Sequence, residues 1–91
     1  MKTLPDNLDC YKKTPEFTEQ TVPAGLLNNH NTKAGTWGEI VVLGGQLEYT
    51  ILEPETQTHI LTPENSGIVE PEVLHRVKPL GSVRFYVAFY R

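Results

Sequence analysis

The sequence predicts a small, single-domain, all-β protein, and three observations carry that prediction. Short runs rich in Val, Ile, Tyr, Phe and Thr recur along the 91 residues. Turn-forming clusters separate these runs, and the chain contains seven Gly and seven Pro. No window of about 11 residues shows a helical apolar stripe with caps. Short strands at regular spacing with turn signals between them are typical of a β-sandwich or a barrel.

Apolar alternation defines six strands after residue 36. Their expected bounds are Trp37–Leu43, Gln46–Leu52, Thr58–Leu61, Gly67–Glu70, His75–Lys78 and Ser82–Tyr90. Gly44 and Gly45 separate the first two strands, and a two-residue glycine connection predicts a tight hairpin. Residues 1–22 are polar and interrupted by proline. We therefore expect an N-terminal arm or edge strand there, and a barrel formed by residues 23–91.

Period-two alternation also predicts which side chains form the core. The residues expected to face inward are Leu47, Tyr49, Ile51, Val83, Phe85, Val87 and Phe89. The opposite face of the last strand carries Arg84, Tyr86 and Tyr90, which can line a pocket, cover an edge or contact a second subunit. For the tyrosines, Tyr49 included, we expect packing of the ring with the hydroxyl at the surface.

Composition excludes several classes of function. Eight Lys and Arg against eleven Asp and Glu give a net charge of −3, which argues against a nucleic-acid-binding protein. Phosphate-binding and dinucleotide-binding glycine motifs are absent. The sequence opens without a secretory leader and has no apolar run of ~18 residues, so we expect a cytoplasmic protein with no membrane contact. Cys10 is the single cysteine and excludes an internal disulfide.

Three histidines are the first candidates for chemistry, because they alone titrate near neutral pH. His30 lies in the polar stretch NNHNTKAG, and His75 lies after the turn that contains Pro71. Two histidines from separate strands of a small barrel can converge on one interior point, as metal ligands require. The alternative for each is a partly buried histidine bonded to the backbone. For His59, in the middle of a strand, that alternative is favoured.

The segments HNTKAGTWG, EPEVLHRV and VRFYVAFYR, with the connection GGQL, resemble the TehB/YeaR-like domain family. The resemblance runs from about Pro23 to Arg91. It implies a small cupin-type double-stranded β-helix, found alone or at the N-terminus of tellurite-resistance methyltransferases. No residues remain for a methyl-donor site, so methyl transfer is not carried over from the fused relatives.

The general cupin pattern implies a site for a divalent metal ion, with Zn, Ni or Fe as candidates. On that pattern His30 takes the first histidine position and His75 the histidine of the second motif, whereas Thr32 stands where another histidine would be. The glutamate position falls just before Glu39. A shift of one residue turns a strand side chain to the opposite face, so Glu39 is a ligand only if a bulge restores its direction.

Three further residues are candidates for contact with a ligand. Trp37 suits the core or a pocket wall better than a recognition role. Arg84 fits a solvated or ion-paired face, with anion capture as the sharper alternative. Lys33, beside His30, is either an exposed loop lysine or a contact for an anionic ligand at the cavity mouth.

Three functions are compatible with these residues. The favoured one is a binding protein that holds a divalent metal or a small anionic ligand and, by resemblance, serves in tellurite or oxyanion stress. The others are a metal-dependent cupin-type enzyme and a protein-interaction module; the incomplete ligand set disfavours catalysis. A barrel of this size buries only about 60–65% of the surface that its unfolded chain exposes. A second subunit would bury more of it, so we expect a homodimer. The arm and the Tyr86/Tyr90 face are the expected contacts.

Overall fold

The structure, a computed structural model, describes all 91 residues. In chain order the elements are β1 (Cys10–Lys13), β2 (Phe17–Thr18), α1 (Ala24–Leu27), β3 (Trp37–Gly44), β4 (Leu47–Ile51), β5 (Gln57–Leu61), β6 (Gly67–Val69), β7 (His75–Pro79) and β8 (Arg84–Tyr90). The six expected strands are all present, each end within two residues of its predicted position. The one helix is a single turn, and nothing helical in the chain has the length and apolar character of a bilayer span.

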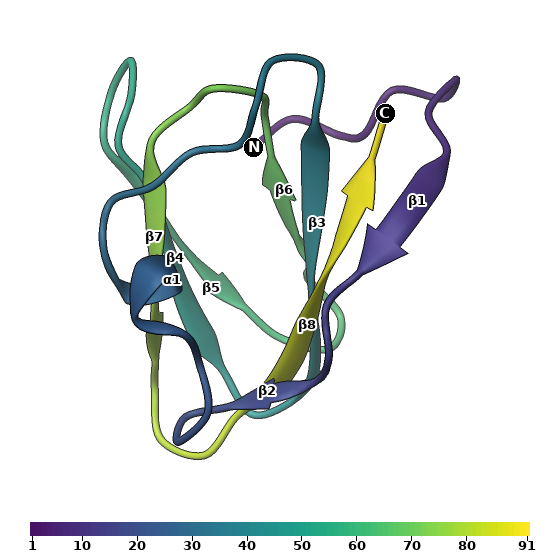
Figure 1. The fold of residues 1–91 in the computed structure, drawn as a ribbon. Helices are drawn as coiled ribbons and strands as arrows, with labels where there is room; N and C mark the ends of the chain where they lie inside the picture. The colour runs from purple at the N-terminus through teal and green to yellow at the C-terminus, as the bar shows by residue number, and fades with distance from the viewer.

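The strands form two antiparallel sheets that face each other (Figure 1). The five-stranded sheet has the order β1-β8-β3-β6, and β2 pairs with the other end of β8. The three-stranded sheet has the order β5-β4-β7. Strands β3 and β8 are the central pair, in register from Trp37 opposite Tyr90 to Val42 opposite Phe85. Residues 1–22 contribute β1 and β2, and both of these strands pair with β8.

The predicted hairpin at Gly44 and Gly45 is wrong. Strand β3 pairs with β6 and β8, whereas β4 pairs with β5 and β7, so the two glycines carry the chain from one sheet to the other. Gly45 has a φ of 77°, and the β3–β8 register shifts between Val42 and Gly44. The apolar faces of β3 and β4 are therefore buried against each other across the core, from opposite sheets.

The core fills the space between the sheets. Its buried members are Ile40, Val42, Leu47, Tyr49, Ile51, Leu61, Val69, Val77, Val83, Phe85 and Val87. Phe89 is partly buried against them, so the predicted inward faces of two strands are confirmed. The expectation for Tyr49 needs a correction, because its side chain is 1% exposed and its hydroxyl donates a hydrogen bond to the Ile68 carbonyl oxygen (2.9 Å). A buried phenol must find an internal partner.

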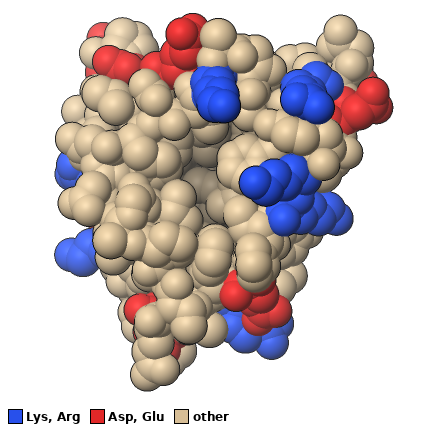
Figure 2. All heavy atoms as spheres, viewed as in Figure 1, with Lys and Arg blue, Asp and Glu red and all other residues tan.

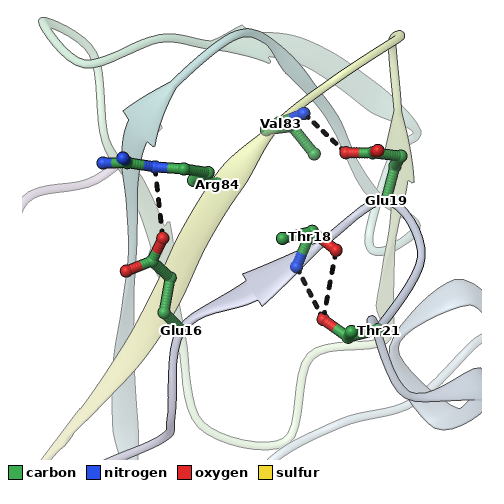
Figure 3. Close-up of polar contacts among 6 residues, drawn as sticks. All are labelled: Glu16, Thr18, Glu19, Thr21, Val83 and Arg84. Atoms are coloured by element: carbon green, nitrogen blue, oxygen red, sulfur yellow. Dashed lines mark hydrogen bonds and ion pairs between the residues drawn. The ribbon is translucent and has the colours of Figure 1, made fainter.

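Side chains around β2 attach the arm to the start of β8 (Figure 3). The carboxylate of Glu19 accepts a hydrogen bond from the backbone N–H of Val83 (3.0 Å), which lowers the pKa of Glu19. Glu16 forms an ion pair with Arg84 (Oε1 to Nε, 3.1 Å). The N-terminal arm is thus fixed to the start of the last strand. The expected homodimer stays a prediction.

Candidate functional site

A cavity of about 520 Å³ lies between the two sheets and appears as a central hollow in Figure 2. Seventeen residues line it, eight of them hydrophobic. They come from β1, α1, the loop before β3, and strands β3, β6, β7 and β8, and Arg91 follows β8. Every element that builds the sandwich except β2, β4 and β5 therefore contributes to the cavity wall.

The deep part of the cavity is apolar. We call Ile40, Val69, Val77, Phe85 and Val87 the apolar floor; each side chain is at most 7% exposed. Strand alternation explains this surface, because these positions are the inward-facing ones of β3, β6, β7 and β8.

The mouth is basic. Lys12, Lys33 and Arg91 line the cavity, and all three residues are exposed; we call them the basic rim. The Arg91 guanidinium lies 4.0 Å from the centre of the Tyr11 ring, a cation–π contact that restricts its position. No Asp or Glu is among the lining residues. Figure 2 shows basic side chains gathered beside and above the hollow.

His30 and His75 meet at the cavity wall. Their backbones form an antiparallel bridge, with His30 N–H donating to the His75 carbonyl (3.0 Å) and His75 N–H donating to the His30 carbonyl (2.8 Å). The ring centres are 4.0 Å apart and the ring planes are inclined by 63°. The structure thus brings together the two histidines that the sequence placed at one point.

Local hydrogen bonds select one tautomer for both rings. Nδ1 of His30 lies 2.9 Å from the Asn28 carbonyl oxygen, and Nδ1 of His75 lies 2.9 Å from the Val73 carbonyl oxygen. A carbonyl oxygen only accepts, so each Nδ1 carries the proton and each neutral ring has its lone pair on Nε2. Backbone bonding of this kind is common in histidines that bind a metal through the other nitrogen.

His75 is neutral at pH 7. Its side chain is 3% exposed, and this burial lowers its pKa to about 4. The bond to the Val73 carbonyl acts in the opposite direction, and the neighbouring His30 lowers the pKa further. The His75 side chain therefore adds no charge to the cavity at neutral pH.

The sequence model of the TehB-like domain matches residues 12–87. The chain belongs to the TehB-like domain family. A probable S-adenosyl-L-methionine-dependent methyltransferase TehB from Haemophilus influenzae Rd is 40% identical over 81 residues, which is 85% of this chain and 28% of that protein. The resemblance to TehB/YeaR-like domains that the sequence motifs indicated is therefore confirmed.

Two solved structures resemble this TehB-like domain. The crystal structure of TehB from Haemophilus influenzae superposes with a TM-score of 0.86 at 38% identity, over 93% of this chain and 32% of that one. An Escherichia coli K12 protein superposes with a TM-score of 0.90 at 23% identity, over 100% of this chain and 97% of that one, and shows the shared fold. The chain thus spans about a third or less of the Haemophilus proteins that it matches.

Glu39 of the TehB-like domain does not join the histidines. Its neighbours Gly38 and Ile40 line the cavity, so Glu39 points to the outer face of the five-stranded sheet. There its carboxylate accepts hydrogen bonds from the hydroxyls of Ser66 (3.0 Å) and Tyr90 (3.4 Å). The bulge in β3 lies closer to the strand end and leaves this alternation unchanged. No bulge turns the Glu39 side chain toward the histidines, so Glu39 is not placed to be a metal ligand.

The structure also places Trp37 and Arg84 away from the cavity. Trp37 lies on the same face of β3 as Glu39, half-buried, opposite Tyr90 of β8. Arg84 is held by its ion pair with Glu16 at the far end of β8, as Figure 3 shows. Neither side chain lines the cavity, so neither is placed to contact a ligand there.

Sequence reasoning missed two of the three residues in the basic rim. Lys12 belongs to the arm and Arg91 to the end of the chain, and backbone hydrogen bonds between Asp9 and Arg91 (3.2 and 3.1 Å) bring these segments together. No signal for this contact was present in the sequence beyond the expectation of an arm or edge strand in residues 1–22. Lys33 had been considered as a contact at the mouth, and the structure places it there.

Proposed function

We propose that this TehB-like domain binds a small anionic ligand in the cavity between its sheets. The observation that carries the proposal is the charge of the lining side chains, which include Lys12, Lys33 and Arg91 and no Asp or Glu. The whole chain has eleven Asp and Glu and a net charge of −3, so the local sign opposes the overall one. A cleft lined by one sign of charge concentrates ligands of the other sign.

The cavity also supports the finer fold assignment. We propose that the two facing antiparallel sheets form a cupin-type double-stranded β-helix, in which the ligand lies between the sheets. The Haemophilus relatives are named as probable methyltransferases, but this chain spans 28% of such a protein. We therefore propose ligand binding, and not methyl transfer, for these residues. The link to tellurite or oxyanion stress rests on family resemblance, and tellurite belongs among the test ligands.

Replacing Arg91 should separate this proposal from nonspecific attraction. We expect Arg91→Gln to weaken binding of the best ligand among tellurite, phosphate, acetate and hexanoate by about tenfold, because a guanidinium–anion contact is lost. Arg84→Gln is the matched control: it removes the same group outside the cavity, and affinity should stay within about twofold. Isothermal titration calorimetry measures both. Equal losses in the two variants, or no binding of any of the four anions, would contradict the proposal.

A divalent metal ion at His30 and His75 is a second candidate, and the tautomer of both rings favours it. Each ring has its Nε2 lone pair available, which fits Zn²⁺, Ni²⁺ or Fe²⁺. No group of three or more His, Cys, Asp and Glu side chains in the chain is arranged to hold a metal ion. The protein would thus supply two ligands, and water would supply the others.

Metal titration of untagged protein tests this second candidate. We expect uptake of about one Zn²⁺ or Ni²⁺ per chain, measured by elemental analysis after dialysis against the free ion. His30→Gln and His75→Gln should each lower the affinity at least tenfold, whereas His59→Gln, which changes a histidine outside the pair, should not. Wild-type protein that takes up no Zn²⁺, Ni²⁺ or Fe²⁺ would rule out a metal at this pair.

A further inference from the structure

We infer that the anion held in this cavity is amphipathic: an organic carboxylate whose charged group lies at the basic rim and whose apolar body covers the apolar floor. The inference rests on the proposed anion binding and specifies the class of ligand. It comes from two kinds of lining residues within one cavity, the exposed cations of the basic rim and the buried hydrocarbon side chains of the apolar floor.

The hydrogen-bond donors of two polar side chains that line the cavity, Thr32 and His75, are already used within the protein, and Nε2 of His75 is left only as an acceptor. Thr32 Oγ1 donates to the Thr36 carbonyl (2.8 Å), and His75 Nδ1 is bonded to the Val73 carbonyl. No buried side-chain nitrogen or oxygen lacks a hydrogen-bond partner. The deep part of the cavity thus presents no free donor to an anionic oxygen.

An inorganic oxyanion fits such a surface poorly. It carries charged oxygens on every side, and burying an oxygen against hydrocarbon without a donor is unfavourable. The charged groups that it would contact are the exposed cations of the basic rim, whose attraction is weakened by water and salt. An organic carboxylate avoids this conflict, because its charge is confined to one end and the remainder gains affinity by contact with apolar side chains.

Two apolar residues of the cavity lining are less buried than the apolar floor and can contact the apolar body of the ligand. Leu26 of α1 and Phe89 of β8 also line the cavity and are only partly buried, so part of their apolar surface is open to a ligand. Leu26 also has a natural control beside it, because Leu27 is 40% exposed and does not line the cavity. The two leucines share one short helix and differ in which way they face.

A chain-length series measures the apolar contribution directly. Acetate, butanoate and hexanoate should bind with affinities that rise about threefold to fourfold for each added CH₂, the increase expected for burial of a methylene group. 1-Hexanol, which matches hexanoate in length without the charge, should bind at least tenfold more weakly. Calorimetry or titration of amide chemical shifts provides the affinities, and tellurite is measured beside them.

Two variants locate the apolar body. Leu26→Gln should reduce the affinity for hexanoate several-fold and leave the affinity for acetate unchanged, whereas Leu27→Gln should change neither. If tellurite binds and the affinity does not rise from acetate to hexanoate, the amphipathic ligand is excluded while anion binding stands. If neither tellurite nor any carboxylate binds, the proposed function itself is overturned.

Discussion

Replacing Gly45 with Ala should lower the free energy of unfolding by about 3 kcal/mol or more, the largest loss we expect from any single methyl group in this domain. An added Cβ would overlap the carbonyl oxygen of Ser82 and approach the Cα of Val83 to 3.0 Å. Gly45 also has a φ of 77°, which side-chain-bearing residues rarely adopt. Because the obstacle is backbone, the chain must shift where it crosses between the sheets.

Two other glycines separate the causes of this loss. Gly81 has nearly the same φ, 80°, but open space around the added Cβ, so Gly81→Ala should cost only about 1 kcal/mol of backbone strain. Gly44 has open space and no positive φ, and Gly44→Ala should change stability by less than about 0.5 kcal/mol. Urea denaturation measures all three variants. If Gly45→Ala costs no more than Gly81→Ala, the close approach to Ser82 is wrong.

Acidification should destabilise the metal-free domain through His75. The unfolded histidine takes up a proton near pH 6.5, whereas burial lowers the pKa of the folded residue to about 4. Between these values the unfolded state binds more protons, so the stabilisation is complete above pH 6.5 and is lost as the pH falls toward 4. The whole window corresponds to a loss on the order of 3 kcal/mol.

A variant without His75 isolates this contribution from that of the carboxylates. We expect His75→Gln to unfold in urea with a much smaller change in free energy between pH 7 and pH 5 than the wild-type domain. His59→Gln should keep the wild-type slope, because no comparable burial affects that ring. Both series contain EDTA, so that no metal ion holds the neutral form. A wild-type slope in His75→Gln would show that another group carries the acid sensitivity.

Alternation made most of the strands predictable, because burial between two sheets imposes a period of two on each of them. Tyr49 and Phe85, for example, were placed in the core from their position in such runs, and both are buried. The direction of the chain after Gly45 was not predictable in the same way. A glycine pair shows that the backbone turns, but the neighbour that a strand acquires depends on packing across the whole core.

The residues of the candidate site were also predictable only in part. His30 and His75 could be brought together because the family resemblance assigns each of them to a histidine position of the cupin pattern. Lys12 and Arg91 could not, because their proximity depends on the pairing of β1 with β8, and β1 has no apolar residue pattern that would predict it. Long-range pairing of a polar strand leaves little trace in the sequence.

That polar strand has a thermodynamic consequence for the cavity. All four residues of β1 are exposed, so the strand is held mainly by its backbone pairing with β8 and has little buried area to resist detachment. Yet it supplies Tyr11 and Lys12 to the cavity mouth. If the proposed ligand contacts Lys12, it would stabilise the pairing of β1 with β8, and that pairing would raise the affinity for the ligand by the same factor.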